Sequence, residues 1–154
     1  MRLKEVLFGK RIIMDDNYFG RIESEKTRRN GVVEPLSWYI HFKMKCFHKE
    51  TFIVIEGDHY GINSKYKEDI KYFIENFDNY YSKEIDKIVS ITTIKDKFKS
   101  WRTDYSLTEI YPAPYDESSF EIVFEPVDEK KKGDYVSFDL INRKIKADIG
   151  DYFI

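Results

Sequence analysis

The segment from Lys65 to Ile91 constrains the fold most, because its apolar residues recur at intervals of three and four. These apolar residues are Tyr66, Ile70, Phe73, Ile74, Phe77, Tyr81, Ile85 and Ile88. Lysine, glutamate and aspartate side chains of mixed sign occupy the opposite face. The pattern predicts one long amphipathic helix, entered through the capping residues Asn63 and Ser64. At about 1.5 Å per residue such a helix reaches about 40 Å, so a broad surface must cover its apolar face.

Strand patterns precede and follow this helix. The predicted strands are one or two within Lys4–Met14, then Tyr18–Glu23, Ser37–Cys46 and Thr51–Glu56 before the helix, and Leu107–Tyr111, Ser119–Glu125, Asp134–Leu140 and Lys144–Ile149 after it. A further helical turn or two is predicted within Lys95–Ser106. Short, turn-rich links favour hairpins over parallel crossovers. We therefore expect a single α+β domain, residues 1–154, in which the helix packs on an antiparallel sheet.

Composition excludes several classes of protein. Hydrophobic residues make up 42% of the chain and aromatic residues 17%, which is typical of a folded chain and not of a disordered one. The net charge of −2 does not give the protein the positive electrostatic potential that attracts nucleic acid, so no nucleic-acid partner is expected. No apolar run approaches the roughly 20 residues of a membrane span, and no signal peptide is recognisable. A single cysteine cannot form an intramolecular disulfide, so the sequence gives no sign of an oxidising compartment. We therefore expect a cytoplasmic protein without membrane contacts.

A cysteine–histidine pair can in principle form a thiolate nucleophile, with the histidine accepting the proton. Cys46 falls on the same face of its predicted strand as Trp38, whereas His41 falls on the opposite face. This alternation predicts a buried, inert thiol, because a reactive cysteine needs a partly exposed, electropositive setting. We therefore predict no catalytic residues and no enzyme activity.

Metal and cofactor sites are also not predicted. The residue types that bind metals occur at His41, His48, Asp58 and His59, and these are the candidates if such a site exists. Their spacing matches no known ligand pattern, and Asp58 with His59 is better explained as a turn in which the carboxylate accepts backbone hydrogen bonds. Gly57 and Gly61 lack the lysine and hydroxyl residue of a phosphate-binding loop, so we expect no cofactor.

The aromatic content gives the one functional hint. The chain has 12 tyrosines and 12 phenylalanines, more than a core of this size needs, and surface tyrosines favour protein contacts. The open face of the sheet is the surface on which we expect a partner protein to bind.

Several phrases along the chain carry a resemblance. They are FGRIE at Phe19–Glu23, SWYIHFKM at Ser37–Met44, TFIVIEGD at Thr51–Asp58, KIVS near the end of the helix, and then LTEIYPAP, SFEIVFEP and GDYVSFDL. In this order they resemble a group of small bacterial domains of unknown function that look like relatives of immunity proteins encoded beside polymorphic toxins. The resemblance defines no functional residues.

The resemblance implies a non-enzymatic cytoplasmic protein that binds and blocks a partner toxin. The net charge of −2 departs from the strongly acidic balance expected of a nuclease inhibitor, which argues against a nuclease as the target. The alternative is a small-ligand-binding or structural domain without catalysis.

Overall fold

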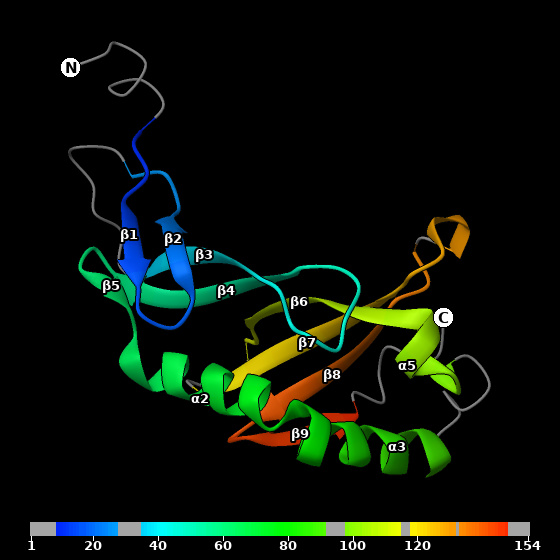
Figure 1. Ribbon diagram of the computed structural model, residues 1–154. Coiled ribbons are helices and arrows are strands. Elements are labelled where there is room, and N and C mark those ends of the chain that lie inside the picture. The colour runs from blue at the N-terminus through cyan, green and yellow to red at the C-terminus, as the bar shows by residue number, and fades with distance from the viewer. Residues whose placement is uncertain (1–8, 28–34, 92–97, 115–117, 132, 148–154) are drawn as a thin grey trace.

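A nine-stranded sheet forms the frame of the computed structural model, which describes residues 9–27, 35–91, 98–114, 118–131 and 133–147. The strand order is β1-β2-β3-β4-β6-β7-β8-β9, and the short β5 pairs with β4. The bounds are β1 Ile13–Asp16, β2 Gly20–Ser24, β3 Leu36–Phe42, β4 Thr51–Asp58, β5 Gly61–Ile62, β6 Tyr105–Pro112, β7 Ser119–Pro126, β8 Val136–Ile141 and β9 Lys144–Ala147. Figure 1 shows the strands as one twisted layer above the helices.

The sheet consists of two antiparallel meanders joined at one parallel pair. The strands β1 to β4 form the first meander and β6 to β9 the second. They meet where β4 pairs in parallel with β6, through Phe52 opposite Glu109 and Ile53 opposite Ile110. The helical segment makes the crossover that a parallel pair requires. The expected α+β class with mainly antiparallel pairing is therefore confirmed.

The predicted helix from Lys65 to Ile91 is not a single regular helix. The structure divides it into α2 (Ser64–Glu75), a π-helical turn η1 (Phe77–Tyr81) and α3 (Ser82–Ile91). The short α5 (Trp101–Asp104) and a 3-10 turn, η2 (Glu129–Lys131), complete the described helices. As predicted, Asn63 caps α2, because its Oδ1 accepts hydrogen bonds from the amides of Lys65 (3.0 Å) and Tyr66 (3.3 Å). None of the described helices is long and apolar enough to span a membrane.

The spacing of the buried residues explains the π-helical turn. Phe73, Phe77, Tyr81, Ile85 and Val89 are all buried, and each lies four residues after the one before. In an α-helix of 3.6 residues per turn, each step of four rotates the side chain by about 40° away from the core. A π-helical turn contains more residues per turn and so corrects this drift. All five side chains therefore face the sheet.

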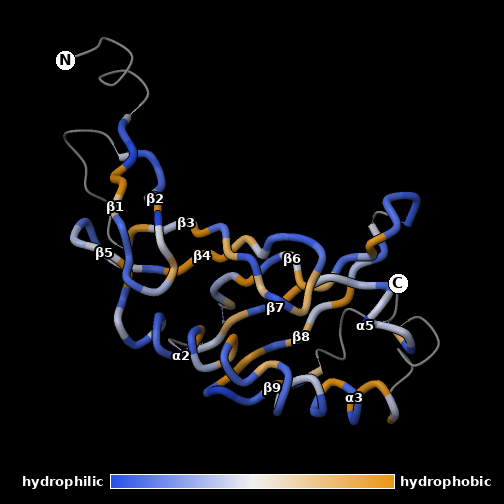
Figure 2. Tube along the Cα trace, viewed as in Figure 1, coloured by the Kyte–Doolittle hydropathy of each residue, from blue (hydrophilic) through white to orange (hydrophobic). Residues whose placement is uncertain are grey.

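The core lies between the helical segment and one face of the sheet, here called the inner face. Rings of β7 meet rings of the helices there: Phe120 lies 5.9 Å from Tyr66, and Phe124 lies 6.5 Å from Phe77, between ring centroids. Figure 2 shows hydrophobic residues concentrated on β3 and β4, while α3 alternates between hydrophobic and hydrophilic positions. Phe120, Ile122 and Phe124 are all buried, which agrees with the alternating pattern of the strand predicted over Ser119–Glu125.

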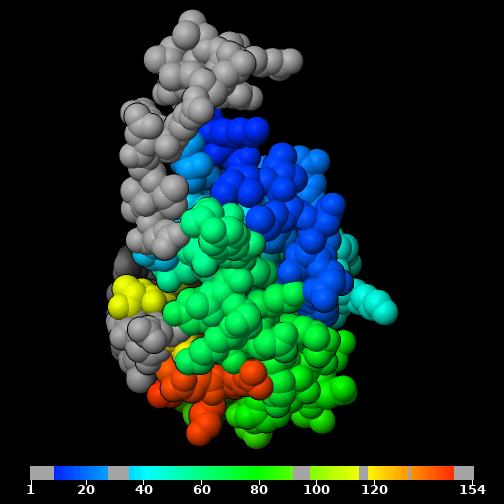
Figure 3. All heavy atoms as spheres, turned by 90° about the vertical axis from the view of Figure 1, so that its left-hand side faces the viewer, coloured from blue at the N-terminus to red at the C-terminus, as the bar shows by residue number. Residues whose placement is uncertain are grey.

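Two ion pairs attach α2 to the two ends of the sheet. Lys67 Nζ lies 2.7 Å from Asp16 Oδ2 at the end of β1, and Arg143 Nε lies 2.7 Å from Asp69 Oδ1. Arg143 belongs to the two-residue β8–β9 turn, in which it and Asn142 both have positive φ. Figure 3 shows the red atoms of the β8–β9 end of the chain against the green atoms of the helical segment.

Several predicted boundaries need correction. The strand expected over Ser37–Cys46 ends at Phe42, and residues 43–50 form a loop that is longer than the predicted hairpin connection. Strand β1 continues to Asp16, beyond the Lys4–Met14 segment in which it was predicted. Parts of the predictions for Lys4–Met14, Lys95–Ser106 and Lys144–Ile149 lie outside the described residues.

Candidate functional site

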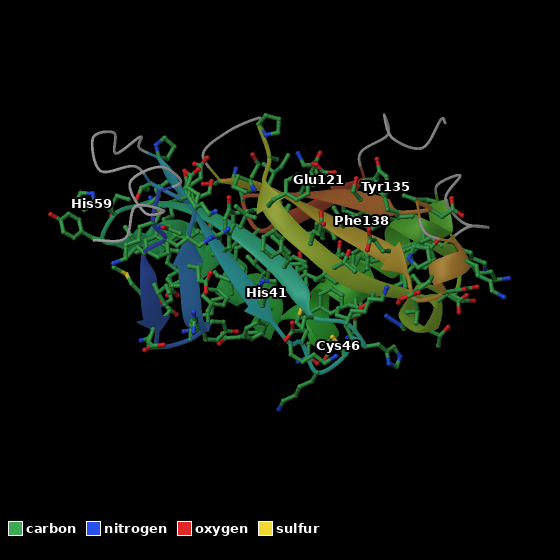
Figure 4. All side chains as sticks on the ribbon, turned by 90° about the horizontal axis from the view of Figure 1, so that it is seen from above. His41, Cys46, His59, Glu121, Tyr135 and Phe138 are labelled. Atoms are coloured by element: carbon green, nitrogen blue, oxygen red, sulfur yellow. The ribbon has the colours of Figure 1, made fainter. Side chains whose placement is uncertain are left out.

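The histidines considered as metal ligands do not converge. His41 is exposed on β3, His48 is exposed in the following loop, and Asp58 and His59 lie in the β4–β5 turn. Figure 4 shows His41 and His59 well apart on the molecule. Asp58 Oδ1 accepts a hydrogen bond from the Tyr60 amide at 2.7 Å, so its predicted role in the turn is confirmed. Among the residues that the structure describes, no group of three or more His, Cys, Asp or Glu side chains could hold a metal ion.

The prediction that Cys46 is buried is wrong. The strand ends before it, and the cysteine is exposed in the loop after β3. Burial of its sulfur against neighbouring atoms, with the nearby Asp78 carboxylate, raises the pKa of the Cys46 thiol to about 11. The thiol is therefore protonated at neutral pH and lacks the electropositive setting of a catalytic nucleophile.

The sheet face opposite the helices, here called the outer face, carries a different set of residues. Strand β4 shows the contrast: Ile53 and Ile55 are buried on the inner face, whereas Phe52, Val54 and Glu56 alternate with them and are half-buried. None of the described helices lies on the outer face, as Figure 1 shows. This face is the candidate functional site.

One half of the outer face is an aromatic depression. The rings of Tyr39 and Phe52 lie 5.6 Å apart, those of His41 and Phe52 5.2 Å apart, and the Arg11 guanidinium lies 5.5 Å above the Tyr39 ring. The depression has a volume of about 740 Å³ and is also lined by Phe19, Arg21 and Glu23. Rings that are half-exposed beside charged groups are characteristic of protein interfaces.

The other half of the outer face is an acidic strip formed by Glu109, Glu121 and Glu125. Strand pairing positions it, because Glu109 lies opposite Val123 and is therefore diagonal to both Glu121 and Glu125. The Tyr111 hydroxyl donates a hydrogen bond to Glu121, and burial together with this bond raises the pKa of Tyr111. The acidic strip adjoins the aromatic depression because Glu109 also pairs with Phe52 across the parallel junction.

A second hollow, at the start of α2, lacks the features of a binding site. It is lined by residues including Glu56, Asp58 and Tyr60. The first free amides of the helix already donate to Asn63, and the two carboxylates oppose the binding of an anion. We therefore do not assign a site there.

The acidic strip was not predicted from the sequence, although its signal is present there. In the strand SFEIVFE the phenylalanines and isoleucine alternate with Glu121, Val123 and Glu125. Placing Phe120, Ile122 and Phe124 in the core therefore places both glutamates on the outer face. Their proximity to Glu109 depends on the β6–β7 register, which includes an irregularity between Leu107 and Glu109.

Comparisons of this chain with models of protein families, with characterised proteins and with solved structures find no match.

Proposed function

We propose that this chain is a non-enzymatic, protein-binding module of the immunity type, which binds and blocks a partner toxin through the outer face of its sheet. The observation that carries the proposal is the continuous surface made by the aromatic depression and the acidic strip, joined at the Phe52–Glu109 pair. The resemblance of the strand phrases to immunity-type domains supports the same function.

The chemistry of the outer face favours a protein partner over catalysis. Its rings supply rigid apolar contact area with little loss of side-chain freedom, and its carboxylates and guanidinium groups supply directional polar contacts. The thiol of Cys46 lies in the loop after β3 and is protonated. We further propose a cytoplasmic location, supported by the presence of a single cysteine in the chain.

The test is binding to the product of the adjacent gene. That protein is produced together with this chain, the complex is purified, and its affinity is measured by calorimetry. Tyr39→Ala removes a ring from the aromatic depression, and we expect it to weaken binding at least about tenfold, as for an interface hot spot. Tyr60→Ala is the matched control, because Tyr60 is 79% exposed in the β4–β5 turn, and it should change affinity by less than about twofold. If no neighbouring gene product binds, or if both variants behave alike, the proposal is wrong.

A small-ligand-binding domain is the second candidate function, favoured by the volume of the aromatic depression. Ligand pockets commonly have volumes of about 300–1,000 Å³, and the depression falls within this range. Nuclear magnetic resonance screening with small aromatic compounds tests it. Shifts confined to the amides around Tyr39, His41 and Phe52, at micromolar compound concentrations, would favour this candidate over the protein-binding module.

A further inference from the structure

The three carboxylates of the acidic strip have no cationic partner among the residues that the structure describes. The described ion pairs are Arg21–Glu23, Lys67–Asp16, Lys87–Glu84, Arg102–Asp86 and Arg143–Asp69. Each of these pairs joins residues outside the strip. Glu109, Glu121 and Glu125 therefore repel one another, and no described residue forms an ion pair with any of them.

This repulsion also affects the pKa of the central residue, Glu109. Partial burial raises the pKa of Glu109, and the charges of Glu125 and Glu121 raise it further. A carboxylate in this position becomes more stable when a positive charge comes close to it. The arrangement therefore favours a positively charged group above Glu109.

The acidity of the strip is local to the outer face. The whole chain has a net charge of −2, with 26 basic and 28 acidic residues. Helix α2, on the other side of the sheet, carries as many carboxylates as lysines, with Lys65, Lys67 and Lys71 against Glu68, Asp69 and Glu75. The acidic strip is therefore a local excess of negative charge, which the sequence total conceals.

The spacing of the strip fits several separate cations better than one ion. Along a strand, residues two apart lie about 6.8 Å from each other, and neighbouring strands lie about 4.8 Å apart. Glutamate side chains at such spacings can still converge, but no group of three or more His, Cys, Asp or Glu side chains among the described residues is placed to hold one metal ion. Separate lysine and arginine side chains of a partner can each pair with one of the three carboxylates.

The surroundings of the strip supply the apolar contact that a protein partner also needs. Phe52 is the pairing neighbour of Glu109 across the parallel junction and is half-buried. Tyr111 lies two positions further along β6 and is half-buried. Charges beside apolar contact area are better excluded from water, which strengthens their pairing with opposite charges.

We propose that the partner bound by the outer face presents a lysine- and arginine-rich protein surface, which docks on Glu109, Glu121 and Glu125. This inference rests on the proposed function and specifies the chemistry of the partner. A basic toxin surface would be recognised by charge, and its association would be accelerated by electrostatic attraction and slowed by salt.

The first experiment needs no knowledge of the partner. An oligolysine peptide is titrated into isotopically labelled chain at low salt, and backbone amide shifts are recorded. We expect shifts at Glu109, Glu121 and Glu125 that disappear in the variant E109Q/E121Q/E125Q. The control variant E68Q/E75Q/E129Q makes the same change in net charge at three exposed glutamates outside the outer face, and should keep the shifts.

Two results would overturn the inference. One is that the peptide changes the chemical shifts of amides outside the strip, or changes the shifts of the strip equally in both variants. The other is that calcium alone, and not the peptide, shifts the strip, because the strip would then be a metal site. Circular dichroism and thermal unfolding of both variants show whether they remain folded.

The second experiment separates this inference from the proposed function. Both variants are measured against the adjacent gene product. We expect E109Q/E121Q/E125Q to weaken binding at least about tenfold more than the control does. The affinity of the unsubstituted chain should also fall more steeply with salt concentration than that of E109Q/E121Q/E125Q. Binding with equal affinity by both variants would refute the basic partner surface and leave the proposed function standing. No binding by the unsubstituted chain would refute the proposed function itself.

Discussion

Arg143 donates from its Nε to Asp69 Oδ1 at 2.7 Å, which connects the β8–β9 turn to α2 across 74 residues of sequence. The Arg143 guanidinium also lies 4.6 Å from the centre of the Tyr72 ring, and the Tyr81 hydroxyl donates to the Arg143 carbonyl at 2.8 Å. One turn residue thus holds the second meander against both α2 and η1.

This contact predicts a non-additive pair of substitutions. Arg143 has φ of 62°, a conformation that costs a residue other than glycine about 1 kcal/mol. Arg143→Gly removes this cost but also removes the partner of Asp69, which is only 8% exposed. In the Asp69→Asn background the charge pair is already absent, while the loss of the Tyr72 contact is the same in both backgrounds. We therefore expect Arg143→Gly to be more favourable there by about 1 kcal/mol.

Urea denaturation of the two single variants and the double variant measures this coupling. Asn142→Gly is the matched control, because it relaxes the same turn without removing an ion pair. Its effect should add to that of Asp69→Asn. Equal effects of Arg143→Gly in both backgrounds would show that the ion pair contributes nothing.

The ion pair of Lys67 with Asp16 predicts a pH-dependent loss of stability. Burial alone would raise the pKa of Asp16, but hydrogen bonds from Lys67 and from the amides of Phe19 and Tyr18 outweigh it, and the pKa is lowered. A lowered pKa means that the carboxylate stabilises the fold above its unfolded pKa of about 3.9 and loses this contribution as pH falls through the folded value.

Asp16→Asn isolates the charge, since an asparagine oxygen still accepts the two backbone hydrogen bonds. We expect it to destabilise the chain by about 1 kcal/mol at neutral pH, and by less as the pH falls through the folded pKa of Asp16. Chemical denaturation across this pH range measures the difference. Asp15→Asn, at an exposed position of β1, is the control and should have little effect. A constant difference at all pH values would contradict the assignment.

Glu109→Gln is expected to stabilise the isolated chain. The raised pKa of Glu109, caused by burial and then by Glu125 and Glu121, means that its charge opposes folding at neutral pH. Stability therefore increases as pH falls through the folded pKa, and the variant loses its advantage there. The gain at neutral pH should be about 0.5 kcal/mol, in the range for like charges on neighbouring strands.

Thermal unfolding of Glu109→Gln beside Glu129→Gln measures this effect, because Glu129 is exposed in η2 and outside the strip. If Glu109→Gln lowers the unfolding temperature, the carboxylate stabilises the fold and is not held in unfavourable surroundings.

Cys46 is expected to react slowly despite its exposure. A thiol with a pKa of about 11 has far less thiolate at neutral pH than free cysteine, and its higher intrinsic nucleophilicity offsets this only in part. Iodoacetamide should modify it about ten- to thirtyfold more slowly than glutathione. Asp78→Asn, which removes a nearby negative charge, should accelerate the reaction severalfold. Reaction as fast as glutathione would show that the thiol is not perturbed.

The sequence predicted the elements better than their arrangement. Alternation identified the inner-face residues of β7 and the exposed side of His41, because two-residue periodicity depends only on the local backbone. The π-helical turn was missed, although the four-residue spacing of Phe73, Phe77 and Tyr81 indicates it. The position of Cys46 was wrong because the end of β3 is set by the loop that follows, in which Met44 and Phe47 enter the core. The acidic strip required the pairing register of β6 with β7, which no local pattern specifies.

The parallel junction between β4 and β6 has a consequence for the route of folding. Each meander forms through contacts between neighbouring strands, whereas joining β4 to β6 closes the long loop that contains all of α2, η1 and α3. Closing a long loop is entropically unfavourable until the helices have docked. In pulsed hydrogen exchange during refolding, the amides that bond across this junction should therefore be protected last, and their early protection would contradict this order. The surface formed by Phe52 and Glu109 would then be completed only in the final step, so that a partly folded chain could not bind its partner.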